Sequence, residues 1–149
     1  MLVKDKVKES KTSMKRTINF SSVPENLSLV EKLVDDICID HNIDDDYYGN
    51  IMISITEAVN NAIQHGNKYD PSKNVEVGFD TDNDAEMLSF TVEDEGEGFD
   101  FNALADPTEP ENIDKLNGRG IFLMQNLADE VDFYKEGRIV ELNFKMAPN

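Results

Sequence analysis

EAVNNAIQHGN, Glu57 to Asn67, is an unusual end for a helix. The residues before it, 46–54, have strong helical character, yet two consecutive asparagines follow in what should be the last turns. Each Asn costs roughly half a kcal/mol relative to Ala inside a helix, because its side chain competes for backbone hydrogen bonds. At about 100° per residue, Glu57, Asn61 and His65 form one polar stripe opposite the apolar side of the helix. This stripe faces either water or a site.

A carboxylate one turn before a carboxamide has a specific chemical use. The side-chain oxygen of Asn61 is a suitable ligand for Mg²⁺, and Glu57 can accept a proton from a hydroxyl group or a water molecule beside it. An exposed helix position would more often hold Glu, Lys or Gln than Asn. The pattern therefore favours a site, and a solvated helix face is the alternative.

A second polar segment, VEDEGEGFD (residues 92–100), follows a strand whose residues alternate between apolar and polar. Asp94 stands at the end of that strand. Gly96 and Gly98 come next, where the backbone can turn sharply and approach a flat ligand closely. The segment thus indicates either one wall of a binding site or an ordinary glycine-rich turn.

A third segment, NGRGIFLM (residues 117–124), has Gly118 and Gly120 directly before a predicted helix. Free backbone N–H groups and the positive end of a helix dipole together bind anions such as phosphate. Arg119, between the two glycines, is the one cation in this segment. The alternatives are a flexible entry to the helix and an arginine that simply faces solvent.

Hydrophobic periodicity places these segments in one α+β domain. The expected elements are a strand within 13–22, helices over 23–41 and 42–66, strands over 75–79 and 88–92, a helix over 118–131 and a hairpin over 131–144. Strands with a single apolar alternation indicate a mixed, mainly antiparallel sheet with one wet face. About three amphipathic helices cover the other face, which predicts a two-layer α/β sandwich.

Composition limits the classes of function. The chain has 149 residues, 39% of them hydrophobic, and a net charge of -17, which would repel a nucleic-acid backbone. The first sixteen residues carry six basic and two acidic side chains, +4 in total, and so leave -21 for the rest. We therefore expect a basic N-terminal arm over 1–16 and a single domain over 17–149.

The sequence predicts a cytoplasmic localisation. Cys38 is the only cysteine, so an internal disulfide is impossible, and a buried thiol is expected. No apolar run approaches the roughly 20 residues that a membrane-spanning helix needs, and the N-terminus does not resemble a signal sequence. These features predict a soluble protein without nucleic-acid or membrane partners.

Taken together, the three segments resemble a known family. Their patterns, E-A-x-x-N-A-x-x-H-G, D-x-G-x-G-F and G-x-G-I-F-L-M, resemble the Bergerat-type ATP-binding fold of gyrase, the heat-shock chaperone ATPase, histidine kinases and the mismatch-repair ATPase. The resemblance covers nearly all of the chain after the basic arm. The size and the wording EAVNNAIQHG look most like the bacterial anti-sigma factor serine/threonine kinases.

The resemblance implies roles at the phosphate end of a nucleotide. Glu57 would be the general base for a protein serine, and Asn61 would hold the Mg²⁺ that bridges the triphosphate. Gly118 and Gly120 would contact phosphate, with Arg119 assigned to phosphate as well.

It also implies roles at the adenine end. Asp94 would accept a hydrogen bond from the adenine amino group, Gly96 and Gly98 would shape the wall against the base, and residues 95–117 would be a lid over ATP. His65 would form hydrogen bonds at the helix end. Related proteins often carry threonines where this chain has Arg138 and Ile139, so a water-mediated adenine contact is in doubt.

The function implied by the resemblance is an enzyme that acts in a partner-switching system. It would use ATP to phosphorylate a serine or threonine of an anti-anti-sigma-type antagonist protein, sequester a sigma factor or similar regulator, and form a homodimer. Two alternatives are an ATP-dependent binding module without phosphotransfer and the nucleotide-binding half of a histidine kinase acting in trans. The possible base Glu57 favours the enzyme, because binding alone needs no base.

Overall fold

A computed structural model describes residues 15–81, 86–98 and 116–146. In the last of these segments the side chains are described only from residue 120 onward. The elements before the sheet's second strand are β1 (Lys15–Ser21), η1 (Pro24–Asn26), α2 (Leu27–Asp40), α3 (Asp45–Asn61) and the π-helix η2 (Ala62–Gly66). The remaining elements are β2 (Asn74–Thr81), β3 (Met87–Glu93), α4 (Leu116–Leu127), β4 (Glu130–Tyr134), η5 (Lys135–Gly137) and β5 (Ile139–Lys145).

The strands form one five-stranded sheet in the order β1-β2-β3-β5-β4, and each neighbouring pair is antiparallel. Alternate residues of the central strands are buried, as the sequence predicts, because successive side chains of a strand point to opposite faces. Phe79, Phe90 and Phe144 meet on the buried face, with ring centroids 5.0 and 6.1 Å apart. The opposite face is partly or fully exposed.

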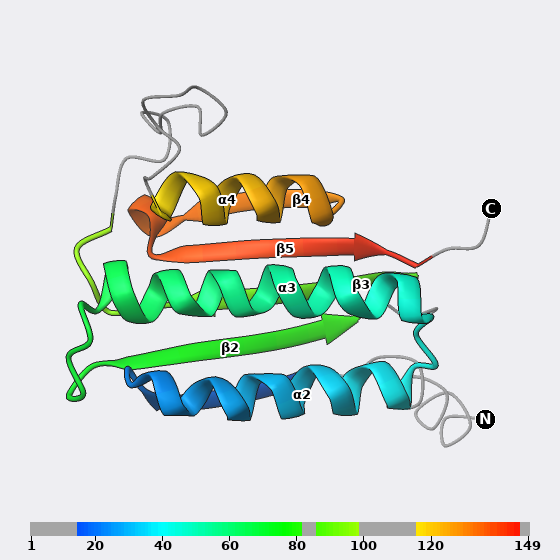
Figure 1. Ribbon diagram of the computed structural model, residues 1–149, viewed down its shortest axis with the longest axis horizontal. Helices are drawn as coiled ribbons and strands as arrows, with labels where there is room; N and C mark the ends of the chain where they lie inside the picture. Colours follow the sequence, from blue (N-terminus) through cyan, green and yellow to red (C-terminus); the bar gives the residue numbers. More distant parts are fainter. Residues whose placement is uncertain (1–14, 82–85, 99–115, 147–149) are drawn as a thin grey trace, which may run out of the picture.

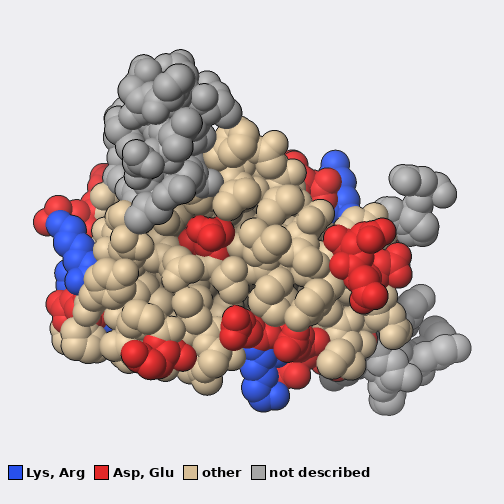
Figure 2. Space-filling model, viewed as in Figure 1, with Lys and Arg blue, Asp and Glu red and all other residues tan. Residues whose placement is uncertain are grey.

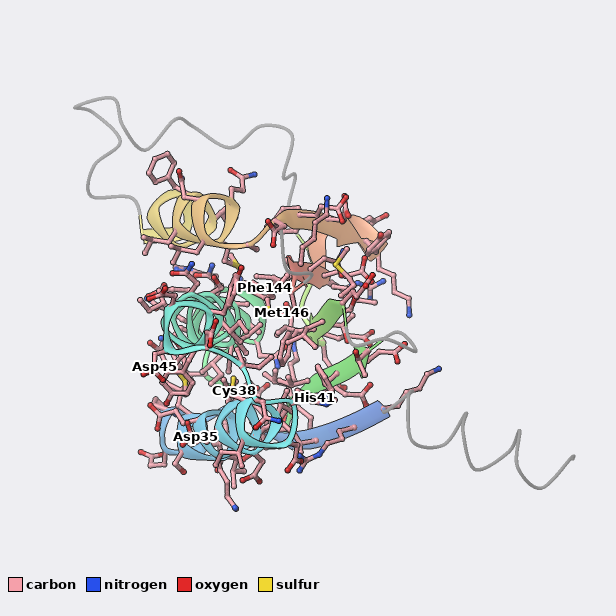
Figure 3. The ribbon with its side chains drawn as sticks, turned by 90° about the vertical axis from the view of Figure 1, so that its right-hand side faces the viewer. Asp35, Cys38, His41, Asp45, Phe144 and Met146 are labelled. Carbon is pink, nitrogen blue, oxygen red and sulfur yellow. The ribbon has the colours of Figure 1, made fainter. Side chains whose placement is uncertain are left out.

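The three α-helices lie side by side on the buried face of the sheet (Figures 1 and 3). Their apolar sides are fully or almost fully buried, through Val34 and Ile37 in α2, Ile51 and Ile55 in α3, and Met124 in α4. Burial of one such side chain stabilises the fold by about 1.5–3 kcal/mol, so these stripes hold the helices on the sheet. This arrangement confirms the predicted two-layer α+β sandwich.

At the far end of the molecule, where α3 begins, polar side chains of α2 and α3 contact each other. The Tyr48 hydroxyl donates a hydrogen bond to the Asp35 carboxylate at 2.6 Å. Cys38 is buried as predicted, and burial together with the nearby Asp35 charge raises the pKa of its thiol to about 11. The thiol is therefore protonated and unreactive at neutral pH.

Two boundaries and one helix type differ from the sequence prediction. Lys15 and Arg16 belong to β1, although they were assigned to the basic arm. Helix α4 begins at Leu116, so Gly118 and Gly120 both lie inside the helix and not before it, with Gly118 in its first turn. The helix that starts at Asp45 does end at Gly66, but its last five residues form a π-helix. Within the described residues, no helix is both long and apolar enough to cross a bilayer.

Candidate active site

A cleft opens at the end of the molecule where α3 ends and α4 begins (left in Figure 1). It encloses about 630 Å³ of empty space, a figure that includes open solvent at its mouth. Its lining residues are Ala58, Asn61, Ala62, His65, Gly66, Val92, Asp94, Gly98, Ile121, Met124, Phe133, Gly137, Arg138 and Val140. The cleft thus joins three of the predicted site residues, Asn61, Asp94 and Gly98.

Glu57 and Asn61 meet helix α4 at Gly120. A Cβ atom added at Gly120 would lie 2.9 Å from Asn61 Nδ2 and 3.3 Å from Glu57 Oε2. A larger residue at this position would push against both side chains, so glycine lets the two helices approach this closely. Glu57 does not line the cleft itself but lies one turn from Asn61, partly exposed. The carboxylate, the amide and Gly120 are therefore neighbours, as the sequence predicted for a site.

Asp94 lies at the other side of the cleft, directly after β3. Its backbone N–H donates to the Arg138 carbonyl at 3.0 Å, and its carboxylate accepts the Gly96 N–H at 2.8 Å. Burial raises the pKa of Asp94 above its ordinary value, although the Gly96 hydrogen bond and the Arg138 charge oppose that change. The carboxylate is thus an acceptor that still has capacity for a ligand donor.

The close approach of Gly66 fixes the position of this carboxylate. A Cβ atom at Gly66 would collide with the Asp94 side chain, so the end of η2 contacts Asp94 only because the residue is glycine. Gly98 has a φ of +84°, a conformation that glycine adopts freely, and it lies against the Glu136 carbonyl. Gly98 thus lines the cleft, and Gly96 lies against Gly66 and the Asp94 side chain. The predicted role of both glycines against an adenine base remains a prediction.

Two predicted residues are described only in part. The backbone of Gly118 lies in the first turn of α4, and the side chain of Arg119 lies outside the described residues. Residues 99–115 of the predicted lid are outside them as well, whereas Glu95 to Gly98 are described. The roles proposed for these positions remain predictions.

His65 lines the cleft from the π-helix. Its Nε2 atom is buried and has no hydrogen-bond partner among the described residues, so the ring hydrogen bond predicted at the helix end is not made by this atom. Burial lowers the pKa of His65, which keeps the imidazole neutral at neutral pH. Buried polar atoms rarely lack partners, and π-helical turns often occur at functional sites. Both features fit a site that receives a polar ligand.

Asn67, the last residue of the opening stretch, is a polar connection that the sequence analysis missed. It is 1% exposed, and its Nδ2 donates to Ser22 Oγ at 2.7 Å and to the Asn74 carbonyl at 3.0 Å. Its Oδ1 accepts the Glu95 N–H at 2.8 Å. Asn67 therefore ties the helix end to two strands and to the segment that follows Asp94.

Arg138 is a second residue whose role the sequence analysis did not assign. It lines the cleft, its carbonyl accepts the Asp94 N–H, and its charge acts on the Asp94 carboxylate. The available signal was its position directly after Gly137 in the predicted last hairpin. Ile121, Met124 and Phe133 add apolar walls, which suit a flat aromatic base.

The donor set also limits how a metal could bind. No group of three or more His, Cys, Asp or Glu side chains is placed to hold a metal ion within the described residues. A resident metal centre needs several protein ligands, whereas Mg²⁺ that arrives with a phosphate ligand needs only one or two. The amide oxygen of Asn61, next to the Glu57 carboxylate, fits the second case.

Fold and cleft together define an ATPase-type nucleotide-binding domain. The chain belongs to the histidine kinase-like ATPase domain family, whose model matches residues 20–144.

The chain is similar to several curated proteins named Serine-protein kinase RsbW. It is 38% identical over 98 residues to Serine-protein kinase RsbW of Staphylococcus epidermidis, which covers 58% of each chain. It is 37% identical over 87 residues to Serine-protein kinase RsbW of Bacillus subtilis (strain 168), 54% of this chain and 53% of the relative. With the protein of that name from Staphylococcus aureus (strain JH9), it shares 33% over 94 residues, 58% of each chain. The chain thus spans a little over half the length of the curated relatives it matches.

Proposed function

We propose that this protein is an ATP-dependent protein serine/threonine kinase of the anti-sigma type. It phosphorylates a serine or threonine of an anti-anti-sigma-type antagonist protein and sequesters a sigma factor or similar regulator. The observation that carries the proposal is the meeting of Glu57 and Asn61 against Gly120, at one end of a cleft whose other side holds Asp94. Similarity to proteins named Serine-protein kinase supports the same assignment.

The adenine base of ATP would occupy the cleft. Asp94 accepts a hydrogen bond from the adenine amino group, because its carboxylate is half-buried and receives only the Gly96 N–H from the neighbouring backbone. Gly98 and the apolar side chains Ile121 and Met124 line the cleft against the flat faces of the base. His65, with its unpaired buried nitrogen, is available to a polar group of the nucleotide.

The phosphate groups would lie toward α4. Asn61 supplies one oxygen ligand to the Mg²⁺ that accompanies the triphosphate, and the backbone N–H of Gly118 in the first turn of α4 contributes a donor. Gly120 contacts the phosphate end by leaving space beside Asn61, where a larger residue would intrude. Arg119 balances phosphate charge. Bound ATP with Mg²⁺ supplies the phosphoryl group and most of the charge neutralisation.

Glu57 acts as the general base. The acceptor hydroxyl oxygen forms a bond to the γ-phosphorus, the bond from that phosphorus to the β-γ bridging oxygen breaks, and ADP leaves. The hydroxyl proton moves to the Glu57 carboxylate, which is partly exposed and so accessible to a protein substrate. Asn61, one helical turn away, would hold the Mg²⁺ that arrives with ATP.

The proposal includes the wider setting of the kinase. The protein acts in the cytoplasm as a homodimer, and the domain that begins with β1 at Lys15 carries ATP binding after a short basic arm. Light scattering tests the dimer, and a monomer mass in solution would remove that part alone.

Calorimetry and phosphotransfer test the main proposal. We expect Mg·ATP to bind the wild type, and labelled phosphate to pass to an anti-anti-sigma-type antagonist protein from the source organism. Glu57→Gln keeps the shape of the side chain but removes the base, so transfer falls by about 100-fold or more while ATP affinity is retained. If wild type and Glu57→Gln both bind the antagonist and neither labels it, the chain is an ATP-dependent binding module and not a kinase.

A further inference from the structure

Helices α3 and α4 are nearly free of charge in a highly charged protein. Charged residues make up 30% of the chain. Between Asp46 and Lys68, however, Glu57 is the only Asp, Glu, Lys or Arg, and in α4 the only one is Arg119. A solvated helix face normally carries many charges, so this depletion indicates a surface that another molecule covers.

The same two helices, which carry few charged residues, also expose apolar side chains. Ile53 of α3 is 46% exposed and Leu123 of α4 is 39% exposed. The two helices run in opposite directions, and Gly120 contacts Glu57, so one turn further along α4 Leu123 approaches the level of Ile53. We call the surface formed by Asn50, Ile53, Asn60, Leu123 and Asn126 the uncharged face. Figure 2 shows one acidic group near the middle of this side of the molecule and the other charged groups toward its edges.

Glu57 lies within this face. On α3 it follows Ile53 by one turn and precedes Asn60 by three residues, and it is partly exposed. A protein that delivers a hydroxyl group to Glu57 must therefore cover the residues around it. The one acidic group of α3 after Asp46 thus stands among uncharged neighbours, where a bound protein would shield it from water.

A second copy of this chain fits the face poorly. A symmetric dimer would apply the same patch on both subunits and so bury the Glu57 carboxylate of each subunit in one contact. Two unpaired carboxylates buried together are strongly unfavourable, and the contact would block access to the proposed base. A different protein, without acidic groups at its contact surface, avoids both problems.

We propose that the uncharged face of α3 and α4 is the docking surface for the phosphoacceptor protein, which meets it with an apolar, uncharged patch around the acceptor hydroxyl. This inference rests on the proposed kinase function. Apolar contacts bring affinity here, because Ile53 and Leu123 lose their exposed area on docking.

Matched pairs of substitutions test the docking surface. Ile53→Glu and Leu123→Glu place a charge in the face. Their controls, Ile39→Glu and Leu29→Glu, make the same changes at exposed positions of α2 outside it, where the native residues are 73% and 47% exposed. None of the four residues lines the cleft. Phosphotransfer to purified anti-anti-sigma-type antagonist proteins of the source organism is measured beside Mg·ATP affinity and thermal unfolding. Ile53→Asn serves as a milder variant should Ile53→Glu unfold.

We expect Ile53→Glu and Leu123→Glu each to raise KM for the antagonist by about tenfold or more, with ATP affinity unchanged. The two α2 controls should leave both quantities at the wild-type values. Wild-type KM in both face variants would overturn the docking surface while the kinase function stands. If wild type labels no antagonist although it binds ATP, the kinase function itself fails, and the docking surface with it. Loss of a dimer in Ile53→Glu without a change in KM would assign the face to a second copy.

Discussion

The two ends of α3 differ in how their polar groups are satisfied. At its start, the Tyr48 hydroxyl is hydrogen-bonded to Asp35, and the neighbouring thiol of Cys38 is buried and protonated. At its end, His65 Nε2 has no partner among the described residues, and burial raises the pKa of Asp94 across the cleft. Near the start of α3, His41 Nε2 is also buried without a partner among the described residues. The difference between the two ends therefore lies in the hydrogen-bonded Tyr48 at the start and the desolvated Asp94 beside a cleft at the end.

The difference has an energetic meaning. Unpaired buried polar atoms and a desolvated carboxylate reduce stability, so they persist only where the surrounding structure holds them. At the cleft that support comes from Asn67 and from the two close glycine contacts, at Gly66 and Gly120. Residues that do not contact the ligand thus stabilise the end of α3 that lies at the cleft. Substitutions at this end should change both stability and nucleotide affinity, whereas substitutions at the other end should change stability alone.

The largest effect is expected from Asn67→Ala. This change leaves the Glu95 N–H, the Asn74 carbonyl and Ser22 without their partner in a fully buried position, which should lower the free energy of unfolding by about 3 kcal/mol. Because the segment after Asp94 loses its support, nucleotide affinity should fall as well. Urea denaturation and calorimetry measure the two effects.

Asn60→Ala is the matched control in the same stretch. No hydrogen bond holds that side chain in a buried network among the described residues, so stability should stay the same or rise by a few tenths of a kcal/mol, because Ala favours the helix. Equal losses for the two variants would show that Asn67 supports the site no more than any helical asparagine.

Asp94→Asn should separate binding from stability. Loss of a hydrogen bond to a charged group weakens Mg·ATP binding by about 1.5–3 kcal/mol, roughly tenfold to more than 100-fold. Stability should not fall at neutral pH, because the variant no longer buries a carboxylate whose pKa is raised. Calorimetry and denaturation check both, and Asp80→Asn, at an exposed strand position, should change neither.

The pH dependence follows from the same raised pKa. The folded chain binds a proton at Asp94 more readily than the unfolded chain does, so this group lowers stability as pH rises from its ordinary titration range through the raised value. The stability advantage of Asp94→Asn should therefore disappear in acid, where Asp94 is protonated. ATP affinity of the wild type should weaken over the same acidic range, and an unchanged affinity would contradict the adenine contact.

The smallest effect is expected at the other end of α3. Tyr48→Phe removes the hydrogen bond to Asp35 and should lower Tm by a few degrees at most, without any change in ATP affinity. Thermal unfolding and calorimetry measure the two quantities. A change in ATP affinity would mean that the two ends of the helix are coupled.

The sequence predicted most of the fold because the relevant signals are local. Apolar residues recur every three or four positions in the helices and every second position in the strands. The helices, the last hairpin and the sandwich class can therefore be predicted from residues that are close together along the chain. The positions of Glu57, Asn61 and Asp94 at one end of the molecule could be predicted only through the resemblance, since they come from elements far apart in sequence. Their chemical roles remain predictions.

By itself, the sequence determined which residues line each element, and it identified the segments that carry chemistry. Only the tertiary structure decided that Gly120 rests against Glu57 and Asn61, that Arg138 enters the cleft, and that Asn67 is a buried connection. The physical reason is that both effects arise only when the helices pack on the sheet. The hydrogen bond from Asn67 to Ser22 joins residues 45 positions apart, and the Asp94 carboxylate loses water only in the packed structure. No local repeat in the sequence encodes either effect.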